Sequence, residues 1–383
     1  YLNREQILDL IKKKQIYSNK PLNKNQIQPA SLDLTLSDKC HRIKASFIPN
    51  NIKISKVIKE LSLSKIDLNQ NTLLEKNCIY LCELNEKLNL PNNIMGKSNP
   101  KSTTGRLDIF TRVITENGKE YDFINYKYKG KLYLEIIPQS FSIIIKKNTS
   151  LNQIRFFQGS NIENKFKQIN ISVSIKKNQV TAYKAKKITS AIDLNKINFY
   201  KVSKYWEEII PEDNYFIIER DEFYILRSKE SIIVKNNQAA ELEPFKDSFG
   251  NFRVHYAGFF DPGFGNSKSG TPAVLELRAY DTPFIIRDGQ LVGQLNYYEI
   301  DEIKKCFTLY VKFPKNRWKE IERAEKNDAE GERIYKNLKA EYTLHKAPKA
   351  RFRWRGWQGL GAGGIGGGLH ITGLGAGDAR LVT

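Results

Sequence analysis

Residues 31–36, Ser-Leu-Asp-Leu-Thr-Leu, alternate polar and apolar side chains with a period of two. Successive side chains of a β-strand point to opposite faces of the sheet, so this alternation predicts a β-strand. Residues 132–137, Leu-Tyr-Leu-Glu-Ile-Ile, form a second strand-like run. Many such runs follow each other, separated by Asn, Pro, Gly and Lys, which is typical of a β-sandwich or small barrel and not of a βαβ fold. In residues 2–13, by contrast, apolar residues at helical spacing predict a short N-terminal helix.

The chain also repeats itself. Residues 75–81, Glu-Lys-Asn-Cys-Ile-Tyr-Leu, resemble residues 219–225, Glu-Arg-Asp-Glu-Phe-Tyr-Ile, 144 positions later. Glu135 and Glu276, each within an apolar run, correspond at an offset of 141. An ordered series of such matches predicts two tandem all-β domains of about 150 residues. The predicted boundaries are residues 1–162 for the first domain and 163–314 for the second.

Beyond Pro314 the composition changes twice. Residues 315–350 are highly charged and are predicted to form a solvated helical extension. Residues 351–383 are rich in Gly and contain Arg but no Lys. Without a preceding strand or a Lys-Ser/Thr pair they are not a P-loop, and we expect a flexible or non-native tail.

The overall composition excludes several classes of protein. Across 383 residues, 62 Lys and Arg against 42 Asp and Glu give a formal net charge of +20, one signature of nucleic-acid binding. The excess is mostly Lys scattered through a chain rich in Asn and Ile, so we attribute it to compositional bias and expect no nucleic-acid partner. No apolar run approaches the ~20 residues that span a bilayer, so no membrane partner is expected. The four cysteines are too few for a disulfide scaffold, and the cytoplasm is the expected location.

Residues 99–106, Asn-Pro-Lys-Ser-Thr-Thr-Gly-Arg, place two cations five positions apart with three hydroxyls between them. Such a segment can surround a polyphosphate, because hydroxyl and backbone N–H groups donate while Lys and Arg neutralise charge. The same composition also describes an ordinary solvated turn. This segment alone therefore leaves both interpretations open.

Glu276 is the one acid in the apolar run at residues 274–277, and Glu135 is its counterpart in the first repeat. Burying a lone carboxylate costs free energy unless the group forms an ion pair or has a catalytic role. A raised pKa would suit a general base that accepts a proton from water. The alternative is a Glu on the exposed face of an edge strand. A protein-bound metal is not expected, because Cys78 and Cys82 have no second pair and the zinc deaminase signature is absent.

Together four segments resemble the dCTP deaminase family, a branch of the trimeric dUTPase-like all-β fold, in its long two-domain bacterial form. The segments are residues 27–34 (Ile-Gln-Pro-Ala-Ser-Leu-Asp-Leu), 98–108 (Ser-Asn-Pro-Lys-Ser-Thr-Thr-Gly-Arg-Leu-Asp), 252–265 (from Phe-Arg-Val-His to Asp-Pro-Gly-Phe-Gly) and 273–278 (Ala-Val-Leu-Glu-Leu-Arg). The resemblance implies two tandem distorted jelly-roll or β-barrel domains and a homotrimer or other homo-oligomer. It also implies zinc-independent hydrolysis of dCTP to dUTP and ammonia, with Mg²⁺ bound through the triphosphate.

The resemblance also assigns roles to residues. It implies triphosphate binding by Lys101, Ser102, Thr103 and Arg106, nucleoside binding by Ala257, Asp261 and Gln294, and general base catalysis by Glu276 or its counterpart Glu135. Two departures stand out: Gly258 and Phe259 replace a His and an Arg of the family's turn, and no closing C-terminal segment is recognisable after Pro314.

The two repeats divide these motifs between them. The first repeat keeps the phosphate segment, whereas the second keeps the Asp-Pro-Gly turn and Glu276. We therefore expect a composite site, with phosphates on repeat one and the base on repeat two of the same or an adjacent chain. A dUTP diphosphatase, a bifunctional enzyme and a catalytically inactive nucleotide-binding homologue are the alternatives.

Overall fold

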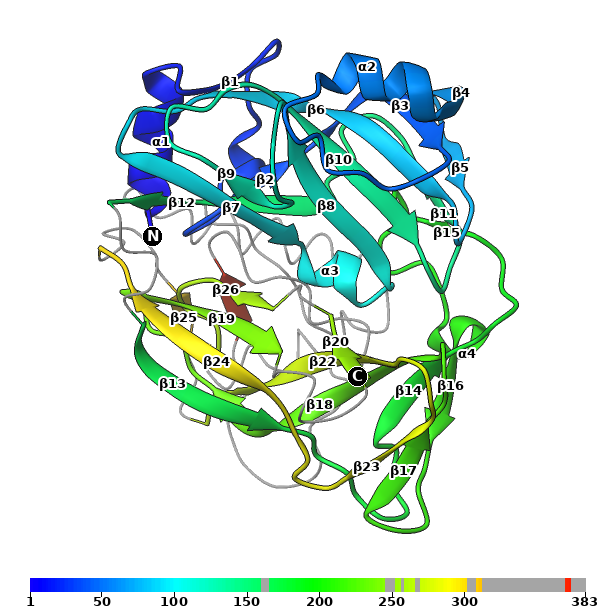
Figure 1. Ribbon diagram of the computed structural model, residues 1–383. Coiled ribbons are helices and arrows are strands. Elements are labelled where there is room, and N and C mark those ends of the chain that lie inside the picture. Colours follow the sequence, from blue (N-terminus) through cyan, green and yellow to red (C-terminus); the bar gives the residue numbers. More distant parts are fainter. Residues whose placement is uncertain are drawn as a thin grey trace, which may run out of the picture. The chain divides into compact units, whose positions relative to one another are not determined.

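The computed structural model describes residues 1–159, 165–244, 252–255, 258–265, 269–301, 308–311 and 369–372 (Figure 1). These residues form mainly strands, which confirms the predicted all-β class. The chain divides into two compact units: the first contains Tyr1–Ile303, and the second begins at Lys304. In the second unit, β25 (Thr308–Val311) pairs antiparallel with β26 (Leu369–Thr372). The extension predicted at residues 315–350 lies outside the described residues, as does the tail predicted at 351–383 apart from β26.

The predicted N-terminal helix is present as α1 (Arg4–Lys12). It begins at Asn3, whose side chain accepts hydrogen bonds from the backbone N–H groups of Glu5 and Gln6. This capping satisfies donors that have no partner within the helix. The apolar spacing buries Ile7 and Leu10 against the core of the first repeat.

Three sheets contain the strands of the first repeat. The largest has the order β4 (Ser62–Asp67), β3 (Leu36–Ile43), β6 (Ile79–Asn89), β10 (Lys129–Pro138), β8 (Ile109–Thr115), and β1 (Ile16–Ser18) also pairs with β6. The second has the order β2 (Leu32–Leu34), β12 (Asn152–Gln158), β7 (Ile94–Pro100), β9 (Phe123–Ile124). The third has the order β15 (Ile192–Asp193), β11 (Ile143–Ile145), β5 (Thr72–Leu74), so β15 joins this sheet from beyond the predicted seam.

The second repeat builds its sheets in a matching order. One has the order β16 (Trp206–Ile209), β14 (Ala182–Ala185), β18 (Phe223–Ile232), β22 (Thr271–Ala279), β20 (Phe252–Val254). The next has the order β13 (Lys165–Ser172), β24 (Leu291–Glu299), β19 (Gln238–Pro244), β21 (Phe259–Phe260), and β17 (Tyr215–Ile218) pairs with β23 (Phe284–Arg287). In both repeats the strand with the lone Glu, β10 or β22, lies between two neighbours. The boundary at residue 162 stays a prediction, because residues 160–164 are outside the described part.

Short helices lie between the strands: η1 (Lys24–Gln26), α2 (Ile54–Leu61), α3 (Ser102–Gly105) and α4 (Val202–Tyr205). Each repeat buries its own apolar core, with members such as Leu134 in the first and Leu275 in the second. In the described part of the chain, no helix is long and apolar enough to cross a bilayer. A disulfide links Cys40 and Cys82, which face each other across β3 and β6.

Candidate active site

The predicted phosphate segment forms the turn of helix α3. The N–H of Lys101 and the hydroxyl of Thr104 both donate to the carbonyl of Leu151, at 3.0 and 2.7 Å. The segment ends at Asp108, which has a φ of 53° in the left-handed region that Asp tolerates better than most residues. These contacts hold the segment in one conformation beside β12.

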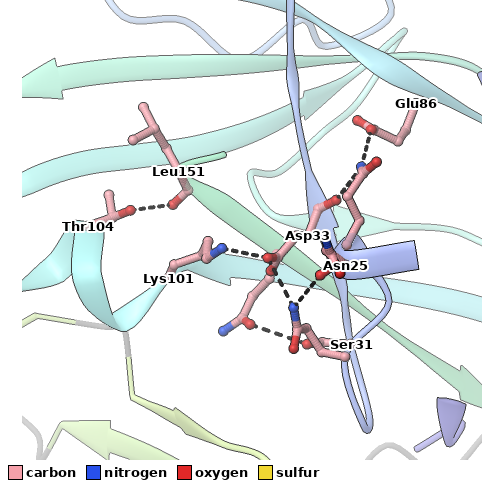
Figure 2. Close-up of polar contacts among 10 residues, drawn as sticks. Asn25, Ser31, Asp33, Glu86, Lys101, Thr104 and Leu151 are labelled. Atoms are coloured by element: carbon pink, nitrogen blue, oxygen red, sulfur yellow. Dashed lines mark hydrogen bonds and ion pairs between the residues drawn. The ribbon is translucent and has the colours of Figure 1, made fainter. Parts of the chain in front are cut away.

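Lys101 belongs to a polar cluster on the first repeat (Figure 2). Its Nζ atom lies 2.5 Å from Oδ2 of Asp33, which also accepts a hydrogen bond from Gln28 at 3.3 Å. Beside them, Ser31 donates to the side-chain oxygen of Gln153 at 3.2 Å. Burial raises the pKa of Asp33, whereas the positive charge of Lys101 lowers it. Lys101 is therefore tied into a partly buried cluster, unlike a lysine in a freely solvated turn.

The Asp-Pro-Gly turn of the second repeat reaches this cluster. Oδ1 of Asp261 accepts a hydrogen bond from the N–H of Ala30 at 3.2 Å. The pKa of Asp261 is raised to about 7, mainly by burial and also by the nearby Asp33 carboxylate, against the opposing effects of the Ala30 hydrogen bond and of Lys101. Gly265 in the turn has a φ of 61°, and a Cβ there would clash with a backbone carbonyl of β18. The turn thus depends on glycine and places a carboxyl group next to the phosphate segment.

Glu276 lies in the middle of β22, with only 5% of its surface exposed. Its carbonyl accepts a hydrogen bond from the N–H of His255 at 2.9 Å. Burial raises the pKa of the Glu276 carboxyl to about 7; Arg106 opposes this shift and Asp108 adds to it. Glu276 of the second repeat therefore lies within electrostatic reach of the phosphate segment of the first. Its inner strand and its burial rule out the alternative of an exposed edge-strand Glu.

Arg278 also lies at the candidate site, although the sequence motifs assigned it no role. Its guanidinium forms an ion pair with the Asp108 carboxylate and donates to the hydroxyl of Ser140 at 3.2 Å. Ser140 in turn donates to Asp108 at 2.6 Å. Because side chains two apart on a strand share a face, the spacing between Glu276 and Arg278 was the available signal. This ion pair ties β22 to the end of the phosphate segment.

Glu135 has a different environment from its counterpart. It is 1% exposed, and Ser46 donates to its carboxylate at 2.5 Å. The guanidinium of Arg112 lies 3.8 Å away and stacks over the ring of Tyr121. Burial raises the pKa of Glu135, whereas the hydrogen bond from Ser46 lowers it. The first repeat therefore surrounds its own acid with Ser46 and Arg112, while Glu276 lies near Arg106 of the phosphate segment.

Three of the other predicted site residues lie in the described part of the chain. Ser102 and Thr103 are half-buried in α3, beside Lys101. Gln294 lies on β24 in register with Asn170 and Glu243. Ala257 falls outside the described residues.

His255 is a buried side chain beside Phe110. Burial lowers the pKa of His255 to about 4, so the ring is neutral at physiological pH, and it packs edge-on against Phe110.

Within the described ranges, no group of three or more His, Cys, Asp and Glu side chains is arranged to hold a metal ion.

Comparisons with known proteins identify the family. A model of the 2'-deoxycytidine 5'-triphosphate deaminase (DCD) N-terminal domain matches residues 1–160, and a model of its C-terminal domain matches residues 145–312. The "dCTP deaminase, dUMP-forming" of Methanocaldococcus jannaschii is 29% identical over 178 residues, which cover 40% of this chain and 80% of that protein. The protein of the same description from Methanococcus maripaludis is 26% identical over 171 residues, with the same coverage.

A solved structure matches over most of the chain. It is the crystal structure of 2'-deoxycytidine 5'-triphosphate deaminase from Agrobacterium tumefaciens, 38% identical, with a TM-score of 0.74. The match covers 78% of this chain and 98% of that one. This chain therefore belongs to the dCTP deaminase family.

Proposed function

We propose that the protein deaminates dCTP by hydrolysis, with Glu276 as the general base. The observation that carries this proposal is the buried Glu276 carboxyl, with its pKa raised to about 7, next to Arg106 of the phosphate segment. Glu276 accepts a proton from water as the water oxygen bonds to C4 of the cytosine ring. The C4–N bond then breaks, and the same proton leaves with the amino group as ammonia. A base with a pKa near the working pH suits both transfers.

Lys101, Ser102, Thr103 and Arg106 are the proposed partners of the triphosphate. The two cations lie at opposite ends of one helical turn, with the hydroxyls between them. Mg²⁺ enters as part of the substrate, bound by phosphate oxygens as is usual for this ion. We propose that Asp261 and Gln294, with Ala257, contact the nucleoside. The proposed base and cations come from one chain, so each chain can form a site. We also propose a homo-oligomer, as the resemblance implies, and a cytoplasmic location, as the low cysteine content suggests.

Product analysis tests the proposal. The full-length chain is incubated with dCTP and Mg²⁺, and ammonia, dUTP and pyrophosphate are each quantified. Equal amounts of ammonia and dUTP are expected, and a zinc chelator added with Mg²⁺ should leave turnover unchanged. Binding of dCTP without release of ammonia would contradict the proposal and identify an inactive homologue.

A bifunctional enzyme that also releases pyrophosphate is the second candidate. Two carboxyl groups, Asp33 and Asp261, lie beside Lys101, where either could position water against a phosphate. The relatives described as dUMP-forming are consistent with this reaction. Pyrophosphate appearing with ammonia in equal amounts would establish it.

Substituting Lys101 by Ala should raise the KM for dCTP about 10- to 100-fold, because a charged hydrogen bond to phosphate contributes about 1.5–3 kcal/mol. Initial rates of ammonia release at varied dCTP concentrations measure this effect. Lys101→Arg is the matched control: it keeps the positive charge and should keep the KM near that of the original protein. An unchanged KM in the Ala variant would remove Lys101 from the phosphate site.

The pKa of Glu276 predicts an acid limb in the pH profile. A base must be ionised to act, so kcat/KM should fall about tenfold per pH unit below pH ~7. Asp108→Asn removes a negative charge that raises this pKa, so it should move the limb to lower pH. A limb near the ordinary Glu value of 4.5 in the original protein would contradict the assignment.

A further inference from the structure

A cavity of about 680 Å³ lies between the repeats, apart from Lys101 and Glu276. Residues 76–77 and 139–140 of the first repeat line one side, and residues 185–187 and 220–223 of the second repeat line the other, together with Arg278. Its volume is within the range of cavities that hold small ligands. The proposed function assigns no role to this cavity.

The lining of this cavity is strongly cationic. It contains five basic side chains, Lys76, Lys186, Lys187, Arg220 and Arg278, and two acidic ones, Asp221 and Glu222. Asp108, just outside the lining, pairs with Arg278. Even with Asp108 counted, two positive charges remain without a balancing carboxylate in this group.

The contacts of the lysines explain this imbalance. Lys187 is paired with Glu222 at 2.7 Å. Lys76 and Lys186 instead donate to backbone carbonyls, of Lys187 and Ser203, each at 2.7 Å. A carbonyl accepts the hydrogen bond but does not neutralise the charge. Two ammonium groups are therefore held in place with their charge still available to an anion.

Two of these cations, Lys76 and Arg220, lie at corresponding positions of the repeated turns at residues 75–80 and 219–224. In the first turn, the hydroxyl of Tyr80 accepts a hydrogen bond from the N–H of Glu75 at 2.8 Å. In the second, Tyr224 accepts from Glu219 at 3.0 Å. The residues after Lys76 and Arg220 both adopt left-handed backbone, with φ of 61° and 60°. A rigid turn loses little conformational freedom on binding, which favours affinity.

We propose that this cavity is a second anion site, which binds a small ligand bearing phosphate groups. The side chains of Asn77, Gln139 and Ser140 add hydrogen-bonding groups to the cations. Arg278 lines the cavity and also forms an ion pair with Asp108 near Glu276. The side chain of Arg278 would therefore connect a ligand in the cavity to the candidate active site. The inference goes beyond the proposed function and does not depend on it.

Calorimetric titration of the full-length chain with inorganic tripolyphosphate tests this site. Arg220 is already paired with Asp221 at 3.1 Å. The variant Lys76→Ala/Lys186→Ala therefore removes the two lining cations that have no carboxylate partner in the described part of the chain. The control variant Lys129→Ala/Arg287→Ala removes the same charges from exposed positions outside the cavity. Lys101→Ala separately reports on the proposed triphosphate segment.

The expected result is loss of one binding event, or an affinity about tenfold weaker, in the cavity variant. The control variant should keep that event, and so should Lys101→Ala. Equal stoichiometry and affinity in the cavity variant and the control would overturn the proposal. If only Lys101→Ala weakened binding, the tripolyphosphate would belong to the active site and the cavity would not be an anion site.

Discussion

Glu276→Gln is expected to lower the rate of ammonia release from dCTP about 10³-fold, because Gln cannot accept the proton of the attacking water. The substitution keeps the size of the side chain and removes no packing from the buried middle of β22. The pKa of the Glu276 carboxyl is raised to about 7, so a neutral side chain at this position is compatible with the folded state. Binding of dCTP should therefore survive while turnover is lost. Single-turnover assays of ammonia release, with dCTP binding measured by calorimetry, separate the two effects.

Glu135→Gln is the matched control. It changes the corresponding acid of the first repeat, which is held by Ser46 and Arg112 and not by the phosphate segment. We expect it to retain turnover within about threefold, as usual for a change that does not touch the reacting atoms. Loss of turnover in the Glu135 variant alone would show that the base has been assigned to the wrong repeat.

Arg155→Leu is expected to lower the free energy of unfolding by about 3–5 kcal/mol, because it leaves a buried carboxylate without its main partner. The side chain of Arg155 on β12 is fully buried and lies 3.1 Å from Glu241 on β19, so the pair joins the two repeats. The ring of Phe259 lies 4.4 Å from the same guanidinium. Urea denaturation at neutral pH, followed by circular dichroism, measures the loss.

The double variant Arg155→Leu/Glu241→Leu is the control for this experiment. Replacing both members of a buried ion pair with apolar residues is often nearly neutral, so most of the stability should return. Among the described residues, Glu241 has two further partners: Lys97 at 3.0 Å, which is partly exposed and can turn to water, and the hydroxyl of Tyr1 at 3.2 Å. A loss below about 1 kcal/mol in the single variant would contradict a stabilising role for the pair.

The same ion pair predicts a dependence of stability on pH. Nearby Arg155 and Lys97 lower the pKa of Glu241 to about 2, despite its burial. A depressed pKa stabilises the folded state at pH values above the ordinary 4.5, and this contribution is lost as the pH falls towards 2. Denaturation curves of the Arg155→Leu variant should therefore show a weaker dependence on pH across this interval.

Much of the fold could be predicted from local patterns in the sequence. The alternation in residues 31–36 corresponds to β2 and the start of β3, and the run at residues 132–137 lies within β10. The helical spacing near the N-terminus corresponds to α1. The repeated sequence appears as matching strand orders in the two halves. These predictions succeeded because side-chain periodicity and turn composition act over a few residues.

The candidate site could be predicted from the sequence only in part. The sequence indicated Lys101, Arg106 and Glu276 as residue types suited to phosphate binding and proton transfer. It did not indicate Arg278, because an Arg after an apolar run is usually solvated. Nor did it separate Glu276 from Glu135, since both occupy the same place in their repeats.

By itself, the sequence determined the all-β class, the duplication and the chemical groups that each repeat carries. The tertiary structure decided which of those groups meet. It brought Arg106 and Asp108 to Glu276, and it enclosed Glu135 with Ser46 and Arg112. The reason is physical: periodicity is set by neighbours along the chain, whereas the pKa of a carboxyl group depends on burial and on charges that can lie more than a hundred residues away.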